Sequence, residues 1–204
     1  MTKPIPDIVV GRLPIYLRAL SFLATEGTHV TSSHDLGKRL GISAAQIRKD
    51  LSFFGEFGKQ GTGYNVGYLQ EQISRILKVD HEWPVALIGV GDLGRALARY
   101  GGFAHRGFRV VALFDNDPAK IGQTIGDLEI MSIDRLAGVV RERDIRVAML
   151  TVPAKEAQGV ADVCAAAGIK AILNYAPITL KVPEGALVQH TDPVTHLQRM
   201  TYYL

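Results

Sequence analysis

The chain has 204 residues, of which 47% are hydrophobic, and this is enough for one or two domains with ordinary buried cores. No uninterrupted apolar run reaches the ~18 residues of a transmembrane helix, and Pro4, Pro6 and Asp7 occupy the place of a signal peptide's apolar block. The single cysteine, Cys164, cannot form an internal disulfide. We therefore expect a cytoplasmic protein rather than a membrane-embedded or disulfide-stabilised secreted one.

The net charge of +3 comes entirely from the first part of the chain. Residues 1–80 contain ten basic and seven acidic side chains, whereas residues 81–204 contain thirteen of each. A small basic surplus is weak support for nucleic-acid binding unless the basic residues share one recognisable element.

The first eighty residues predict a series of helices. The first helix runs from Pro6-Asp7 to Gly27, and Pro14 is expected to bend it or to start a new turn. Ser32–Asp35 is a capping box that starts a short helix ending at Gly41, and Ser43–Gln46 is a second capping box that starts a helix over 44–54. Two capped helices joined by a short turn with a glycine are typical of a helix-turn-helix.

The glycine-rich segment 58–66 predicts a β-hairpin, which would be the wing of a winged helix-turn-helix. A further amphipathic helix is expected over 68–78, followed by a linker that ends at Pro84. These patterns predict a DNA-binding domain over 1–80 and a linker over 81–84.

The helix over 44–54 carries the candidate DNA contacts. Ile47, Leu51 and Phe54 mark its buried face by their spacing. Arg and Lys bind phosphates or guanine edges, and Gln matches adenine. We therefore expect DNA contacts from Ser43, Gln46, Arg48, Lys49, Ser52 and Phe53, and from Lys59 and Gly61 of the wing. The alternative is a solvated helix face in a helical interaction domain.

After Pro84 the pattern changes to alternating strands and helices. Short β-rich runs are expected over 85–88, 110–114, 147–152 and 171–174, with helices over 92–104, 132–143 and 154–167. This alternation predicts an α/β domain with a doubly wound parallel sheet over 85–192. The last helix, 193–204, is apolar and has no obvious place on that sheet.

The motif Gly89-Val-Gly-Asp-Leu-Gly94 follows a predicted strand and opens a predicted helix. In a dinucleotide-binding loop of this kind the first glycine permits a tight turn. The second lets the backbone approach a pyrophosphate, and the third lets the helix pack on the strand. Asp115 ends the next strand, where a carboxylate binds the adenine ribose, and Asp117 adds charge that would repel a 2′-phosphate. NAD(H) is therefore favoured over NADP(H), although a glycine-rich turn without a ligand is the alternative.

The loops at other strand ends complete the expected ligand crevice. The candidate contacts are Gly89, Val90, Gly91, Asp92, Leu93, Gly94, Asp115, Asn116, Thr151, Val152, Pro153, Asn174, Tyr175 and Ala176. No Ser/Tyr/Lys set, metal-ligand cluster or His–carboxylate pair stands out in this part of the sequence. We therefore expect no catalytic residues and no metal site.

Seven motifs follow one another along nearly the whole chain: Arg12–Arg18, Ile47–Gly55, Gly61–Tyr64, the glycine loop with Tyr100–Phe103, Phe114–Pro118, Leu150–Pro153 and Ile172–Pro177. In their order and spacing they resemble the Rex family of bacterial redox-sensing transcriptional repressors. The resemblance implies a winged helix-turn-helix joined to a Rossmann-like domain. It also implies a homodimer that binds a palindromic operator and leaves it when NADH binds.

The resemblance further implies roles for the end of the chain. The helix over 193–204 would be swapped into the partner subunit, and Tyr100 and Asp192 would lie near the nicotinamide. Arg18 would pair with Asp192 across the dimer as part of the switch. Pro193 departs from the family, which often has an aromatic residue there.

Two other functions remain open at this point. One is an NAD-dependent oxidoreductase with an appended helical domain, and the other is a nucleotide- or coenzyme A-binding interaction protein that never contacts DNA. Turnover of NADH with a small carbonyl would favour the first, and absence of salt-dependent duplex binding would favour the second.

Overall fold

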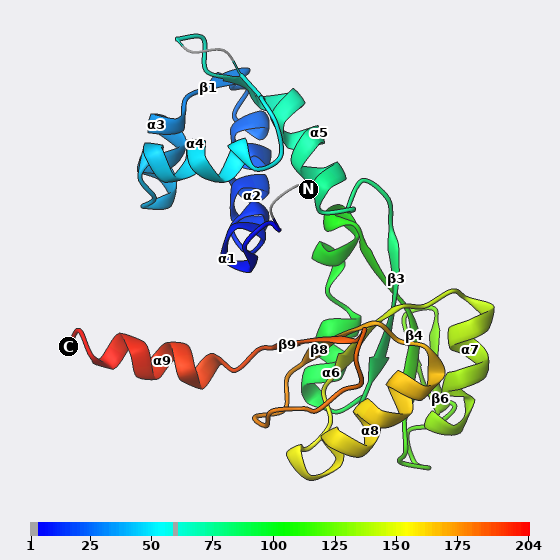
Figure 1. Ribbon diagram of the computed structural model, residues 1–204. Coiled ribbons are helices and arrows are strands. Elements are labelled where there is room, and N and C mark those ends of the chain that lie inside the picture. Colours follow the sequence, from blue (N-terminus) through cyan, green and yellow to red (C-terminus); the bar gives the residue numbers. More distant parts are fainter. Residues whose placement is uncertain (1–3, 59–60) are drawn as a thin grey trace. The chain divides into compact units, whose positions relative to one another are not determined.

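The computed structural model describes residues 4–58 and 61–204. The chain divides into two compact units, Met1–His81 and Glu82–Leu204. The first unit contains five helices and two short strands within the described residues (Figure 1). In chain order they are α1 (Asp7–Val10), α2 (Leu13–Thr25), β1 (Val30–Thr31), α3 (Ser33–Leu40), α4 (Ala44–Ser52), β2 (Tyr64–Asn65) and α5 (Val66–Ile76).

The two helix caps expected from the sequence are confirmed. The Ser32 hydroxyl accepts a hydrogen bond from the Asp35 backbone N–H at 3.1 Å, and the Ser43 hydroxyl accepts one from the Gln46 N–H at 3.2 Å. These side chains satisfy backbone donors that the first turn of a helix leaves unpaired. The core of the unit is built from all the longer helices: Leu13, Tyr16 and Leu20 of α2, Leu36 of α3, Ile47 and Leu51 of α4, and Leu69 and Ile73 of α5.

The single helix expected from Pro6 to Gly27 is divided, with Gly11 and Arg12 between α1 and α2. Pro14 lies in the first turn of α2, where its missing N–H breaks no helical hydrogen bond. By length and composition the segment Asp7–Thr25 is apolar enough to cross a membrane. Its apolar face, however, is part of the core of this helical unit.

The expected β-hairpin over 58–66 includes residues 59 and 60, which lie outside the described residues, and the strand in its described part pairs with a distant segment. Tyr64–Asn65 pairs antiparallel with Val30–Thr31, the two residues that precede the helix-turn-helix. Gly63 has a φ of +75°, and a Cβ at this position would lie 2.5 Å from the Thr31 carbonyl oxygen. The glycine therefore permits a close approach between distant parts of the chain rather than a local hairpin turn.

The second unit is a seven-stranded sheet with helices on both faces (Figure 1). Its strands are β3 (Trp83–Ile88), β4 (Phe108–Asp115), β5 (Thr124–Ile125), β6 (Leu128–Ser132), β7 (Val147–Leu150), β8 (Ala171–Asn174) and β9 (Leu187–His190). They lie in the order β5-β6-β4-β3-β7-β8-β9, and every neighbouring pair is parallel except β5 with β6. Without the antiparallel edge strand, this is the order of a Rossmann sheet.

Two apolar clusters lie on opposite faces of the sheet, because successive strand residues point to opposite sides. Ala86 and Ile88 of β3 contribute to one cluster, which is covered by α7 (Leu136–Glu142) and α8 (Ala154–Ala167). Val85 and Leu87 contribute to the other cluster. It is packed against α6 (Asp92–Ala98) and the 3-10 helix η1 (Gly101–Arg106). A short 3-10 helix, η2 (Ile133–Arg135), precedes α7.

Several expected boundaries are corrected. The first strand begins at Trp83, inside the expected linker, because Trp83 and Pro84 pair with the start of β4. The helix expected over 92–104 ends at Ala98 and is followed by η1. Strands β5, β6 and β9 were not expected, since each is short or has a weakly apolar sequence.

The last helix, α9 (Pro193–Thr201), contains no buried residue. Asp192 caps it, with Oδ1 accepting a hydrogen bond from the Val194 N–H at 2.9 Å. Val194, Leu197 and Met200 are 54%, 59% and 63% exposed, so the apolar side of α9 is uncovered in the single chain.

Candidate functional site: a dinucleotide crevice and a helix-turn-helix

The loop between β3 and α6 is tightly packed at its first and third glycines. Gly89 has a φ of +92°, and a Cβ there would lie 2.7 Å from Val152 Cγ1. A Cβ on Gly94 would collide with the Gly89 carbonyl oxygen and lie 3.0 Å from Thr151 Oγ1. Thr151 Oγ1 itself donates a hydrogen bond to the Gly89 carbonyl oxygen at 2.6 Å. Both glycines are therefore required by contacts within the protein.

Gly91 differs from them, because a Cβ there would meet no protein atom within 4 Å. Its φ of −80° is accessible to any residue. Neither packing nor backbone conformation therefore explains this glycine. It caps the N-terminus of α6, where unpaired N–H groups and the helix dipole favour an anion. A pyrophosphate needs this open space, so the loop fits a dinucleotide.

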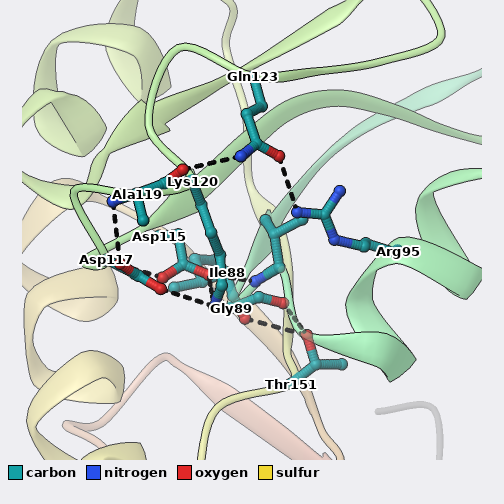
Figure 2. A network of polar contacts seen from close by, with 10 residues as sticks. Ile88, Gly89, Arg95, Asp115, Asp117, Ala119, Lys120, Gln123 and Thr151 are labelled. Carbon is teal, nitrogen blue, oxygen red and sulfur yellow. Dashed lines mark hydrogen bonds and ion pairs between the residues drawn. The ribbon is translucent and has the colours of Figure 1, made fainter.

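Asp115, at the end of β4, is almost completely buried, and its carboxylate accepts hydrogen bonds from three donors (Figure 2). Oδ2 accepts hydrogen bonds from the Val90 N–H at 2.7 Å and from Lys120 Nζ at 3.1 Å, and Oδ1 accepts one from the Asp117 N–H at 2.9 Å. Burial raises the pKa of Asp115, but the two backbone N–H groups and Lys120 lower it further, to below its usual value. The carboxylate is therefore charged at neutral pH, and it ties the glycine loop to the next strand.

Lys120 is a site residue that sequence reasoning missed. Its ammonium group lies 3.1 Å from Asp115 Oδ2 and 3.7 Å from Asp117 Oδ2, so a cation accompanies the two carboxylates at the end of β4. The signal was available in the segment Asp115–Lys120, because two residues five apart in a tight loop can meet. The Asp117 carboxylate also accepts the Ala119 N–H at 2.9 Å, which forms that turn.

A second polar contact holds the same loop to α6. Arg95 Nη2 donates to Gln123 Oε1 at 3.1 Å, and Gln123 Nε2 donates to the Ala119 carbonyl oxygen at 2.7 Å (Figure 2). The loop after β4 is therefore connected to both the glycine loop and the helix that follows it.

A cavity of about 670 Å³ lies at the carboxyl ends of β3, β4 and β7. The strand order reverses between β3 and β7, where Rossmann sheets bind their ligand. Among the expected residues the cavity is lined by Gly89, Gly91, Asp115, Asn116, Thr151, Val152 and Pro153. The wall also contains Ile88, Asp117, Lys120 and Ile133, and four residues of α8 that were not expected, Glu156, Gly159, Val160 and Val163. The volume is suitable for a nucleotide.

A cavity of similar size, about 700 Å³, lies at the opposite ends of β3 and β4, next to Pro84, Arg109 and Val110. It contains none of the expected site residues, and it has neither a glycine loop nor a helix N-terminus. The chemistry of the residues therefore assigns the nucleotide site to the carboxyl ends of the strands.

The remaining expected cofactor residues do not line the cavity. Val90, Gly94 and Ala176 are buried, whereas Asp92 and Leu93 are exposed in the first turn of α6. Tyr100 is exposed and contacts the edge of Phe103, with ring centroids 5.0 Å apart. Burial raises the pKa of Tyr175. Asn174 is fully buried: its amide donates to the Ala176 and Ile178 carbonyl oxygens, both at 3.0 Å, so it shapes the loop after β8.

Of the three expected switch residues, Arg18 lies in the first unit, and Tyr100 and Asp192 lie in the second. Arg18 is exposed on α2, and its side chain makes no hydrogen bond or ion pair with other described residues. Asp192 is the cap of α9.

The helix-turn-helix consists of α3 and α4, which pack against each other. Arg48 and Lys49 are exposed on α4, and Arg48 Nη1 donates to the Ser33 hydroxyl of α3 at 2.9 Å. The Ser52 hydroxyl is turned back onto the Lys49 carbonyl oxygen. Phe53, at the end of α4, is half-buried, Gly61 is exposed, and Lys59 lies outside the described residues. The exposed side of α4 therefore presents two cations and polar side chains together.

Sequence reasoning missed the buried carboxylate of this unit. Asp50 of α4 is fully buried and binds Arg12 and Tyr16. A charged residue in line with the apolar residues Ile47, Leu51 and Phe54 was the available signal, since a buried charge requires partners. No group of three or more potential metal ligands occurs in the described part of the chain.

Two family models match the chain. Residues 80–178 match a family described as "CoA binding domain", and residues 4–52 match one described as "Putative DNA-binding protein N-terminus". Each match falls largely within one of the two compact units.

Whole-chain relatives are known. A redox-sensing transcriptional repressor Rex from Chloroflexus aurantiacus is 57% identical over 98% of this chain and 94% of its own length. The Rex of Streptomyces griseus is 43% identical over 99% of this chain and 80% of its own length. The crystal structure of RSP in complex with beta-NAD+ and operator DNA has a TM-score of 0.93 at 36% identity. It covers 98% of this chain and 93% of that one. The chain belongs to the Rex family of redox-sensing transcriptional repressors.

Proposed function

We propose that this protein is a transcriptional repressor that binds operator DNA with α3 and α4 and senses NAD(H) in the crevice of its second unit. One observation carries the proposal: a capped helix-turn-helix and a dinucleotide crevice occur in the same chain. In that crevice Gly91 leaves open space that no packing contact of the protein requires. RSP, which matches nearly the whole chain, has been crystallised with beta-NAD+ and operator DNA, and also with beta-NADH.

In the crevice we assign each residue a role from its position. Gly91 and the N-terminus of α6 hold the pyrophosphate, and Asp115 accepts a hydrogen bond from an adenine ribose hydroxyl at the one acceptor position that remains, on Oδ1. Asp115 and Asp117 disfavour a 2′-phosphate, so NADH binds more tightly than NADPH. The loops after β7 and β8, with Tyr100, surround the nicotinamide half. The oxidised ring carries a positive charge, and a largely apolar environment therefore favours neutral NADH.

On DNA, the first turns of α4 enter the major groove, as in other helix-turn-helix proteins. Arg48 and Lys49 contact phosphates or guanine edges, and Gln46 contacts a base. Gly61, which is exposed, lies against the DNA backbone.

We infer a homodimer in which α9 of each subunit packs into its partner. The uncovered apolar residues of α9 support this, because such a stripe gains free energy when buried. Asp192 lies at the start of that helix, and we place Arg18 of the other subunit opposite it. Dimeric recognition helices must match half-sites about one DNA turn apart. NADH releases the protein from DNA if NADH binds more tightly to the dimer conformation whose recognition helices do not match the half-site spacing.

The protein acts in the cytoplasm, where its ligands and DNA occur, and it catalyses no reaction. Support for the latter comes from the whole-chain relatives, which are named as transcriptional repressors. The alternative of an oxidoreductase with an appended domain predicts steady turnover of NADH.

The test is an electrophoretic shift titration of the operator with NADH and NAD+ in parallel. We expect NADH to release the operator at concentrations where NAD+ does not. Equal release by both nucleotides would contradict redox sensing. Absence of operator binding at any nucleotide concentration would contradict the repressor function itself.

A further inference from the structure

Asp50 is a buried carboxylate on the inner side of the proposed recognition helix α4. Four hydrogen-bond donors surround it: Arg12 Nε at 2.5 Å, Arg12 Nη2 at 2.7 Å, the Tyr16 hydroxyl at 2.6 Å and Gln46 Nε2 at 2.7 Å. An ionised carboxylate has about four acceptor positions, so this one is saturated. Burial raises the pKa of Asp50, but the bonds from Arg12, Tyr16 and Gln46 lower it more, and it stays charged at neutral pH.

The hydrogen-bond donors to Asp50 come from two helices, α2 and α4. Arg12 and Tyr16 belong to the start of α2, and they hold Asp50, and with it α4, in one rotation about the helix axis. Gln46 lies one turn earlier on α4 itself, within the turn that helix-turn-helix proteins insert into the major groove. The carboxylate therefore connects the scaffold of the unit to one proposed base-contacting side chain.

The contact also determines the direction of the Gln46 amide. An ionised carboxylate only accepts hydrogen bonds, so the amide nitrogen, and not Oε1, must face Asp50. One N–H is used in this bond. The amide retains one donor and one acceptor, and their order in space is now determined.

We infer that Asp50 is a positioning residue, which holds the Gln46 amide in the orientation that pairs with adenine in the operator. Adenine presents an N7 acceptor beside an N6–H donor in the major groove, which a donor–acceptor amide matches in one orientation only. Guanine presents two acceptors there, and cytosine and thymine each present one polar group. A free glutamine would rotate its amide and lose this selectivity, whereas a preorganised one keeps it. This inference rests on the proposed function, because it deepens the DNA-binding role of α4.

The experiment begins with the full-length wild-type protein and a random duplex library, from which its operator is selected. The affinity for that operator and for every single-base substitution in one half-site is then measured at constant salt for Gln46→Ala, Asp50→Asn and Gln70→Ala. Gln70→Ala is the control, because this glutamine of the same unit donates its side-chain hydrogen bond to Ser21 of α2 and not to Asp50.

We expect Gln46→Ala to lose discrimination at one A·T pair by about 5- to 150-fold, the range of one bidentate base contact. Asp50→Asn should lose discrimination at that same pair, since an asparagine side chain also donates and no longer dictates the Gln46 orientation. Affinity for unrelated duplex should change little, and Gln70→Ala should keep the wild-type base preference. In the double variant Gln46→Ala/Asp50→Asn the two losses should not add.

Two results would overturn the inference while leaving the repressor function intact. One is unchanged discrimination in Asp50→Asn, and the other is an equal loss at all base pairs, which indicates a purely structural role. If Asp50→Asn does not fold, Arg12→Met/Asp50→Asn replaces it, because removing both charges leaves no unpaired ion. Failure of the wild type to select any sequence would overturn both the proposed function and this inference.

Discussion

The ammonium group of Lys120 lies 3.1 Å from Asp115 Oδ2, so the carboxylate that we assign to the adenine ribose already carries a cation. The pair lies at the end of β4, beside the backbone N–H of Val90. The local charge at this end of the crevice therefore depends on both residues.

Substitution of the two residues should change the preference for NADH over NADPH in opposite directions. Asp115→Ala should weaken NADH binding, because it removes the hydrogen-bond acceptor for the ribose. It should also lower the ratio of NADH affinity to NADPH affinity, because Lys120 is then free to attract a 2′-phosphate. Lys120→Met should widen that preference by up to about tenfold, since the carboxylates then repel the phosphate without compensation. Fluorescence titration with both reduced cofactors measures the two ratios. Lys170→Met, an exposed lysine of the same unit, is the control. Equal NADH and NADPH affinities in the wild type would contradict the role given to Asp115.

Gly91 and Gly94 provide a matched pair within one loop. Gly94→Ala should lower the melting temperature of the free protein, because its Cβ collides with the Gly89 carbonyl oxygen and overpacking costs about 1–3 kcal/mol. Gly91→Ala should leave the melting temperature unchanged but weaken NADH binding by about tenfold or more, since its Cβ enters only the ligand's space. Thermal unfolding and a binding isotherm distinguish the two effects. Wild-type NADH affinity in Gly91→Ala would place the pyrophosphate elsewhere.

Substitution of the exposed cations of α4 should affect the affinity for DNA and leave the affinity for the cofactor unchanged. Arg48→Ala and Lys49→Ala should weaken operator binding without changing NADH affinity. A lost base contact costs about 1–3 kcal/mol, and a lost phosphate contact lowers the salt dependence. Arg75→Ala on α5 removes the same charge from the same unit and should have little effect on binding. Operator affinity at several salt concentrations tests this, and wild-type affinity in both α4 variants would exclude α4 as the recognition helix.

The Arg18–Asp192 pair is tested by a double-mutant cycle. Because Asp192 caps α9, Asp192→Asn is preferable to alanine: it removes the charge and keeps a side chain that accepts the Val194 N–H. We expect Arg18→Ala to weaken operator binding, and the combined variant to show a coupling of about 0.5–3 kcal/mol. Additive effects would mean that the two residues do not pair. NADH should still bind Arg18→Ala, which checks that the variant is folded.

The lowered pKa of Asp50 predicts acid sensitivity of the first unit. A carboxyl whose pKa is lower in the folded state stabilises it above the unfolded pKa, near 3.8, and this contribution is lost as pH falls through the folded value. The free energy of unfolding should therefore decrease more steeply below about pH 4 in the wild type than in Arg12→Met/Asp50→Asn. Urea unfolding between pH 2.5 and 6, about the range over which such a group titrates, measures both slopes. Equal slopes would show that Asp50 has an ordinary pKa.

The local sequence determined the parts of this protein that depend on short-range interactions. The caps at Ser32 and Ser43, strand β8 and helix α8 have the expected positions, since capping and apolar periodicity act within a few residues. The glycine loop and Asp115 were identified for the same reason. Their spacing reflects one turn and one strand of a Rossmann unit.

Only the tertiary structure decided the long-range pairings. β2 pairs with the distant strand β1, Arg12 contacts Asp50, and Gln123 contacts Arg95. None of these partners can be found from local pattern, because each depends on how separate helices and strands pack. The structure also distinguished Gly91, which faces open space, from Gly89 and Gly94, which face protein atoms. One motif in the sequence thus contains two glycines that packing requires and one that is left for a ligand, and steric contact in three dimensions separates them.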